Sequence, residues 1–228
     1  QQLSLTLNTG DPIPQLGLGV FKVDDEECER VVLEALEVGY PHIDTAMIYR
    51  NEAAVGRAIA RSGVARDELF VTTKLWNSDQ GKATTPDALA TSLELLGLDY
   101  VDLYLIHWPA PLRDVYVETW LAMEDLYGQG LAKAIGVSNF EPDHLERILE
   151  AGSIVPAINQ VELHPAFQQR KVRGFQEPLG IVTEAWGPLG QGKYELSELE
   201  GLEQIAQNHG KSIQQIVLHW HLQEGVVV

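Results

Sequence analysis

The sequence has one cysteine and no long hydrophobic run, and both shortages limit what the protein can be. Because Cys28 has no second cysteine to pair with, no disulfide can form within the chain, as is usual in a reducing cytosol. Cys28 lies in an acidic helix start, so we expect an inert thiol rather than a reactive thiolate. Without a membrane-spanning run or a signal-peptide pattern, we expect a cytoplasmic protein with no membrane partner.

Basic residues are scarce as well. The chain has 16 Lys and Arg against 33 Asp and Glu, which gives a formal net charge of -17. Phosphate binding needs clustered lysine and arginine side chains, so we expect no nucleic-acid partner. The 228 residues are 45% hydrophobic, enough for a large core. No linker or low-complexity stretch interrupts them, and we therefore expect a single domain over residues 1–228.

Several common site motifs are missing. No Cys/His cluster has zinc spacing, and His219 and His221 are two apart on a predicted helix, so we expect no metal. There is no dinucleotide-binding Gly-x-Gly-x-x-Gly. Residues 187–193 nearly match a P-loop, but Tyr194 stands where Ser or Thr must bind magnesium. Residues 136–140 lack the second glycine of a nucleophile elbow, which argues against a serine hydrolase.

The chain does contain a repeated strand-then-helix unit. Residues 3–18 predict a β-hairpin, and apolar strands then end near 20, 44, 74, 107, 138, 161 and 186. Helical patterns follow the strands, one of them predicted to have Thr85 as its N-cap. This order predicts a (β/α)8 barrel with an N-terminal β-hairpin. Residues 226–228 begin an eighth strand, and because such barrels need about 250 residues, we expect the polypeptide to continue past Val228.

Three successive strands end in side chains that can do chemistry. Asp44, Lys74 and His107 end the second, third and fourth strands, and Tyr49 follows Asp44 by five residues. The carboxyl ends of barrel strands build active sites, so these side chains are candidates for one site. The alternative is that Asp44 caps a turn and Tyr49 packs as an ordinary amphipathic aromatic.

Six stretches of the chain carry motifs of a known kind. One is the segment from Gly39 to Glu52, and another is the Asn159-Gln160-Val161-Glu162 segment. The full set is 39–52, 72–76, 102–109, 135–140, 159–162 and 186–190. In this order the six stretches resemble the signatures of the aldo-keto reductase superfamily. The stretch from Trp186 to Tyr194 is similar to diketogluconate reductases within that superfamily.

The resemblance implies catalytic roles for the strand-end residues. Tyr49 would donate a proton to the carbonyl oxygen as hydride arrives from a nicotinamide cofactor. Because a free tyrosine has a pKa of about 10, we expect Lys74 to lower the pKa of Tyr49. Asp44 would hold Lys74 charged and in place, and His107 would orient the substrate by hydrogen bonding.

The resemblance also implies a cofactor site and a substrate pocket. Ser138, Asn139 and Gln160 match the residues that hold the nicotinamide carboxamide, and Trp186 matches the aromatic residue that stacks on its ring. The following loop, with Gly187, Leu189 and Gln191, would fold over the pyrophosphate. The substrate pocket would be lined by Phe21, Trp76 and Trp108.

These implications define the predicted function. We expect an NADPH-dependent reductase of aldehydes or ketones, with sugar-derived dicarbonyls such as diketogluconate as one substrate class. NADH is not excluded, because the family's adenosine-phosphate motif follows the eighth strand and is not in this sequence. We expect a small-molecule carbonyl partner and a monomer. The alternatives are a nicotinamide-binding regulatory barrel without activity and a barrel lyase or isomerase.

Overall fold

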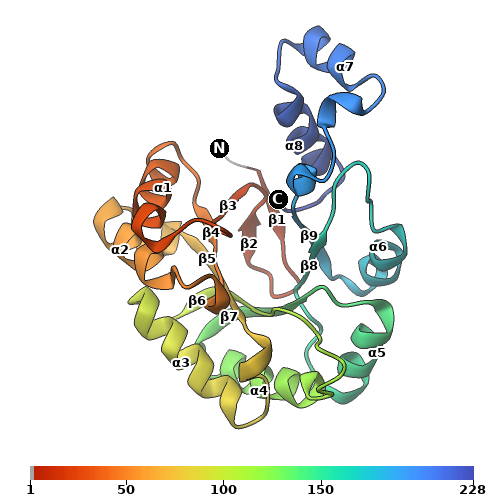
Figure 1. The fold of residues 1–228 in the computed structure, drawn as a ribbon. Coiled ribbons are helices and arrows are strands. Elements are labelled where there is room, and N and C mark those ends of the chain that lie inside the picture. The colour runs from red at the N-terminus through yellow and green to blue at the C-terminus, as the bar shows by residue number, and fades with distance from the viewer. Residues whose placement is uncertain (1–2) are drawn as a thin grey trace.

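The computed structural model describes residues 3–228 and shows a ring of parallel strands surrounded by helices (Figure 1). Each strand pairs in parallel with the next one along the chain, in the order β3-β4-β5-β6-β7-β8-β9. The predicted (β/α)8 barrel is therefore confirmed. The strands are β3 (Gly17–Gly19), β4 (His42–Asp44), β5 (Phe70–Leu75), β6 (Val101–Ile106), β7 (Ala132–Ser138), β8 (Ile158–Glu162) and β9 (Val182–Trp186).

The last residues of the chain occupy the eighth strand position. Val227 exchanges backbone hydrogen bonds with β9, donating to Thr183 O at 3.0 Å and accepting from Ala185 N at 2.7 Å. Val228 accepts from Gly17 N at 2.7 Å on the other side of the gap. The segment forms an isolated β-bridge and not a full strand, but its hydrogen bonds join β9 to β3 and close the ring.

The predicted N-terminal hairpin is also confirmed, and it plugs one end of the barrel. It consists of β1 (Ser4–Thr6) and β2 (Pro12–Pro14), which pair in antiparallel register. Leu7 and Ile13 are buried in one apolar cluster with Phe70 and Leu103 from the barrel strands. The hairpin therefore covers this end of the barrel.

Helices α1 to α6 pack around the outside of the strands, and apolar residues of α1 to α5 belong to the larger core cluster. The helices of residues 3–228 are α1 (Asp25–Glu37), α2 (Glu52–Ser62), α3 (Thr84–Leu96), α4 (Tyr116–Gly128), α5 (Pro142–Ala151), α6 (Arg170–Gln176), α7 (Leu202–His209) and α8 (Ile213–Gln223).

One predicted helix start is wrong. Helix α3 begins at Thr84, so Thr85 lies inside the first turn instead of capping it. The Thr85 hydroxyl donates to Gly81 O at 2.7 Å, a local hydrogen bond back to the preceding turn. The Thr-Pro pair still marks the first turn of the helix, because proline is tolerated where backbone N–H groups have no helical partner.

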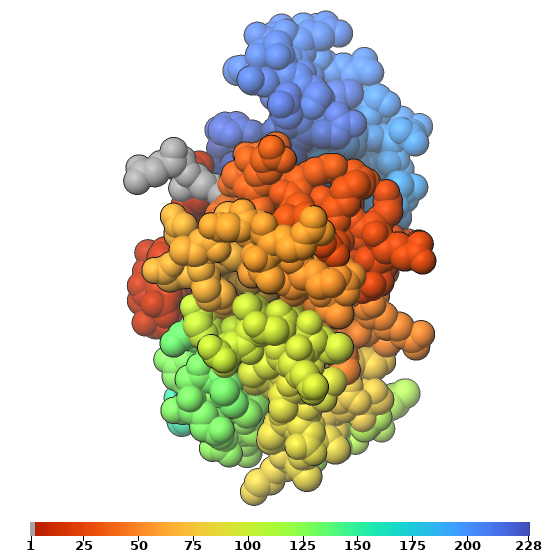
Figure 2. Space-filling model, turned by 90° about the vertical axis from the view of Figure 1, so that its left-hand side faces the viewer, coloured from red at the N-terminus to blue at the C-terminus, as the bar shows by residue number. Residues whose placement is uncertain are grey.

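Helices α7 and α8 form a lobe that stands out from the rest of the molecule (Figures 1 and 2). Of the helices in residues 3–228, none combines the length and the apolar character needed to cross a membrane. The lobe contacts the barrel through α8, where buried His221 makes a 3.1 Å hydrogen-bond contact from Nε2 to Pro188 O. This contact links α8 to the loop that follows β9.

Candidate active site

A cavity of about 1000 Å³ lies at the carboxyl end of the barrel strands. Every residue that the sequence predicted for the site lines this cavity, except Lys74, which is buried beneath it. The predicted residues that line it are Phe21, Asp44, Tyr49, Trp76, His107, Trp108, Ser138, Asn139, Gln160, Trp186, Gly187, Leu189 and Gln191.

Lys74 is a fully buried cation whose three hydrogen-bond donors are all used. Its Nζ contacts Asp44 Oδ1, donates to Thr45 O at 2.9 Å and lies 3.4 Å from the Tyr49 hydroxyl. An ammonium group has three N–H donors, so this arrangement fixes its direction. Burial by itself lowers the pKa of Lys74, but the neighbouring Asp44 and Tyr49 together raise it above its ordinary value. Lys74 therefore remains charged.

Tyr49 follows β4 in a single 3-10 turn, Met47–Tyr49, which brings its hydroxyl over Lys74. The pKa of Tyr49 lies above its ordinary value because burial of the phenol outweighs the attraction of Lys74 for the phenolate. The expected lowering of this pKa is therefore wrong in net direction, although Lys74 does act as predicted. Tyr49 is a neutral phenol near neutral pH, with a cation beside its oxygen.

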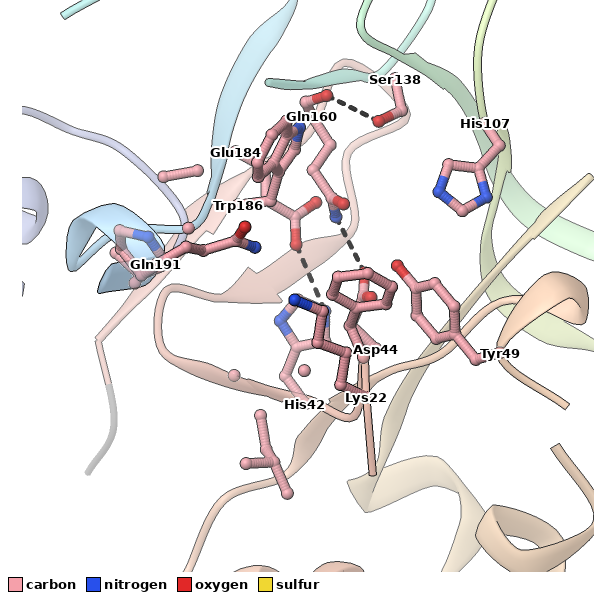
Figure 3. A pocket seen from close by; sticks show the side chains of 18 of the residues that line it. Lys22, His42, Asp44, Tyr49, His107, Ser138, Gln160, Glu184, Trp186 and Gln191 are labelled. Atoms are coloured by element: carbon pink, nitrogen blue, oxygen red, sulfur yellow. Dashed lines mark hydrogen bonds and ion pairs between the residues drawn. The ribbon is translucent and has the colours of Figure 1, made fainter. Parts of the chain in front are cut away.

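His107 directly follows β6 and faces Tyr49 across the cavity (Figure 3). The two ring centroids are 5.7 Å apart, and the Trp76 ring is 5.2 Å from the other side of the imidazole. Burial, assisted by the charge of Lys74, lowers the pKa of His107 to about 3. The imidazole is therefore neutral, so it can donate one hydrogen bond but brings no charge.

Asn139 joins the ends of three strands. Its Nδ2 donates to His107 O at 3.0 Å and to Ser138 Oγ at 3.1 Å, while its Oδ1 accepts from Trp186 Nε1 at 2.8 Å. Its backbone φ of 62° lies in the left-handed region, which asparagine tolerates better than most residues. Hydroxyl and amide groups of β7 and β8 thus gather beside the indole of Trp186.

Gln160 connects this amide cluster to the buried ion pair. Its Nε2 donates to Asp44 Oδ2 at 2.8 Å, and its backbone oxygen accepts from Ser138 Oγ at 2.7 Å (Figure 3). Both oxygens of Asp44 are therefore occupied, one by Lys74 and one by Gln160. The two groups of residues predicted separately form one hydrogen-bonded network.

The loop after β9 is held over the cavity by polar contacts with β8 and the turn that follows it. Lys193 pairs with Glu162, and the Tyr194 hydroxyl lies 3.1 Å from His164 Nδ1. Gly190 has a φ of 85°, and a Cβ there would lie 2.6 Å from the Tyr194 ring, so the loop conformation requires glycine at this position. The loop therefore has a defined conformation, held by side-chain contacts beside the cavity.

The sequence reasoning did not select Glu184 and His42, which lie in a deeper layer of the same cavity. Both are buried, and His42 Nε2 lies 3.8 Å from Glu184 Oε1. The signal was available in the strand periodicity. Residues two apart on a strand share a face, so His42 accompanies Asp44 and Glu184 accompanies Trp186.

The fold and the arrangement at the strand ends define a barrel oxidoreductase site, and comparison with known proteins identifies the family. The model of the aldo/keto reductase family matches residues 15–228, and the chain belongs to this family. It is therefore an NADP-dependent oxidoreductase of the aldo-keto type.

Particular relatives match over almost the whole chain. The glyoxal reductase of Bacillus subtilis (strain 168) is 51% identical over 98% of this chain and 80% of its own length. The methylglyoxal reductase DkgA of Yersinia pestis is 49% identical over 98% of this chain and 80% of its own. A variant of Gox0644, solved in complex with NADPH, is 45% identical with a TM-score of 0.94, covering 100% of this chain and 82% of that one.

Proposed function

We propose that the protein reduces small aldehydes and ketones with hydride from NADPH, and that Tyr49 is the proton donor. The observation that carries this proposal is the Tyr49 hydroxyl held 3.4 Å from the buried Lys74 ammonium at the floor of the cavity. Dicarbonyls of the glyoxal and methylglyoxal type are the first substrates to test, because two close relatives are reductases of these compounds. Sugar-derived dicarbonyls such as diketogluconate form the second class.

The proton comes from the Tyr49 phenol. When bound, NADPH supplies the hydride that turns the carbonyl carbon into an alcohol carbon. Negative charge then develops on the substrate oxygen, and Tyr49 neutralises it by giving up its proton. The phenolate that remains is stabilised by the Lys74 cation at 3.4 Å, through an attraction between opposite charges that the neutral phenol lacks. Asp44 holds Lys74 in this position.

His107 positions the carbonyl group. As a neutral imidazole, it donates one hydrogen bond to the substrate oxygen without competing with Tyr49 to transfer a proton. Its Nδ1 is buried and has no hydrogen-bond partner among residues 3–228. Trp76 packs against the ring edge-on, which limits its rotation.

The groups beside Trp186 fit a nicotinamide. Ser138, Asn139 and Gln160 supply hydroxyl and amide groups, and a carboxamide needs both donors and acceptors on neutral side chains. Trp186 is half-buried and lines the cavity, so its indole is available for stacking. Gly187, Leu189 and Gln191 of the following loop are then the residues that cover the pyrophosphate.

The substrate end of the cavity has aromatic walls. Phe21 and Trp108 are 50% and 41% exposed, and Trp76 lines the same cavity with its ring 5.2 Å from that of His107. Large apolar side chains left in contact with solvent mark a binding surface. A substrate carbon chain would cover them, while its carbonyl oxygen reaches Tyr49 and His107.

The test is NADPH oxidation, followed by absorbance, with glyoxal, methylglyoxal and diketogluconate as substrates and NADH in a parallel arm. We expect turnover with the two small dicarbonyls and a preference for NADPH. Binding of NADPH, seen as tryptophan quenching, without turnover of any carbonyl would instead support the regulatory barrel. No binding of either cofactor would refute the proposal. The monomeric state and the cytoplasmic location stay predictions.

A further inference from the structure

Glu184 is a buried carboxyl on the floor of the cavity. It lies on β9 two residues before Trp186, its exposed fraction is 3%, and it lines the cavity. Its Oε2 has no hydrogen-bond partner among residues 3–228. A buried polar atom without a partner is costly, so an unsatisfied carboxyl in the wall of a cavity is a candidate for interaction with a bound ligand.

Neither Lys74 nor His42 is free to neutralise Glu184. Lys74 spends its three N–H groups on Asp44, Thr45 and Tyr49. His42 faces Glu184 from β4, but its two nitrogens are engaged by Thr72 Oγ1 at 3.2 Å and by Pro14 O at 3.3 Å.

The other charged or titratable neighbours either oppose ionisation of Glu184 or favour it too weakly to offset burial. Asp44 from β4 carries a negative charge, Tyr49 from the turn after β4 is neutral, and Lys74 from β5 is the cation whose charge lowers the pKa of Glu184. Burial first, and then Asp44, raise the pKa of Glu184 to about 8, despite opposing contributions from Gln160 and Lys74. Near neutral pH this carboxyl therefore holds a proton.

Four neighbouring groups titrate outside the range from pH 6 to pH 9. Burial lowers the pKa of His42 to about 4 and that of His107 to about 3. The pKa values of Tyr49 and Lys74 lie above their ordinary values of 10.0 and 10.5. Glu184 can therefore exchange a proton in the physiological range while the protonation of these four groups does not change.

We propose that Glu184 is a further binding residue of the cofactor pocket, which ionises when the positively charged oxidised nicotinamide binds and keeps its proton when the neutral reduced ring binds. This inference rests on the proposed function, because it requires a nicotinamide beside Trp186. The only bond that changes is the O–H bond of Glu184, and its proton goes to solvent. The positive charge of the ring stabilises the carboxylate form of Glu184 and so lowers its pKa.

The consequence is a proton-linked preference between the two forms of the cofactor. Binding of NADP⁺ releases a proton below about pH 8, whereas binding of NADPH does not. A rise in pH therefore strengthens NADP⁺ binding relative to NADPH binding. The ratio of the two dissociation constants isolates this effect, because the adenosine and phosphate groups are the same in both forms and cancel.

The experiment measures Kd for NADP⁺ and for NADPH by tryptophan quenching from pH 6 to pH 9 in the wild type, Glu184→Gln and Glu52→Gln. In the wild type we expect the NADP⁺/NADPH ratio of Kd values to fall by about tenfold, since a differential pKa shift of one unit is a tenfold change in affinity. Calorimetry in buffers of different ionisation enthalpy should count a proton released by NADP⁺ near pH 7. That count requires no variant, so the test survives if Glu184→Gln fails to fold.

Glu52→Gln is the matched control. Glu52 is also buried with a raised pKa, but Thr73 and Ser92 satisfy it and it does not line the cavity. We expect this variant to keep the wild-type pH dependence and Glu184→Gln to lose it. If both cofactors bind and the wild-type ratio is independent of pH, or if Glu184→Gln keeps the dependence, this inference is overturned and the proposed function stands. If neither cofactor binds, both fail.

Discussion

Replacement of Lys74 by methionine tests the buried ion pair at the centre of the site. Methionine keeps most of the apolar stem but removes the charge, so Asp44 loses its cation while its other oxygen still accepts from Gln160. Removing one partner of a buried pair costs about 3–5 kcal/mol, because the remaining charge stays poorly solvated. The Asp44 side chain is 14% exposed, which allows some hydration, so we expect the lower end of this range.

Lys193→Met is the matched control, since Lys193 also pairs with a carboxylate, that of Glu162. Its side chain is 53% exposed, and exposed pairs contribute about 0–1 kcal/mol. The assay is urea unfolding of the wild type, both variants and the double variant Asp44→Asn/Lys74→Met. The double variant should lose less stability than the sum of the losses in Asp44→Asn and Lys74→Met measured singly. A loss of less than about 1 kcal/mol in Lys74→Met, equal to that in Lys193→Met, would refute the reasoning.

The pH dependence of this difference has a definite sign. The folded-state pKa of Lys74 is raised above its ordinary value of 10.5, because Asp44 and Tyr49 together outweigh the burial that lowers it. The stabilisation is therefore fully present below pH 10.5 and is lost as pH rises through the folded-state pKa. We expect the stability difference between wild type and Lys74→Met to be constant between about pH 6 and pH 7, below the range in which Glu184 ionises. A difference that disappears within this range would contradict a charged Lys74.

Three further outcomes follow from the site and its surroundings. Burial holds the pKa values of His42, His107 and His221 near 4, 3 and 4, so these side chains take up protons on unfolding below pH 6.5. The free energy of unfolding should therefore fall as pH drops from 6.5 to 4. A free energy of unfolding in urea that does not change with pH over this range would contradict this. Burial also raises the pKa of the Cys28 thiol to about 11, so a maleimide should label it only after unfolding, and rapid labelling of native protein would contradict this. Lys193→Met should speed NADPH release in stopped-flow measurements, because the loop loses its contact with Glu162; an unchanged rate would show that the contact does not hold the loop.

The strand ends were the predictable part of the site. Asp44, Lys74 and His107 each end or directly follow a short apolar run, and parallel strands bring their carboxyl ends together whatever the sequence of the intervening helices. Tyr49 could be placed near them because only a short turn separates it from Asp44. The barrel, its hairpin and its eighth strand position followed from the same strand-helix order, because few topologies accommodate that order.

The features that sequence could not supply depend on burial and on contacts between distant segments. The net pKa shift of Tyr49 depends on how far burial outweighs Lys74, and a sequence does not state the depth of a phenol. Strand periodicity could place Glu184 on the same face as Trp186, but only the fold shows that it is buried beside His42 with one carboxyl oxygen unpaired. The predicted N-cap at Thr85 was wrong because a threonine hydroxyl can either accept from a backbone N–H at a helix start or donate to a nearby carbonyl. In the structure the Thr85 hydroxyl donates to Gly81 O.

The measurement that tests the central claim most directly is NADPH oxidation by Tyr49→Phe with methylglyoxal, together with its Kd for NADPH. The variant keeps the ring that packs against Phe21 and His107 and loses only the hydroxyl over Lys74. We predict a fall in kcat of about 10²–10⁴-fold, the usual contribution of a general acid, with NADPH affinity nearly unchanged. A variant that binds NADPH normally and turns over at close to the wild-type rate would show that the proton comes from another group and would contradict the account.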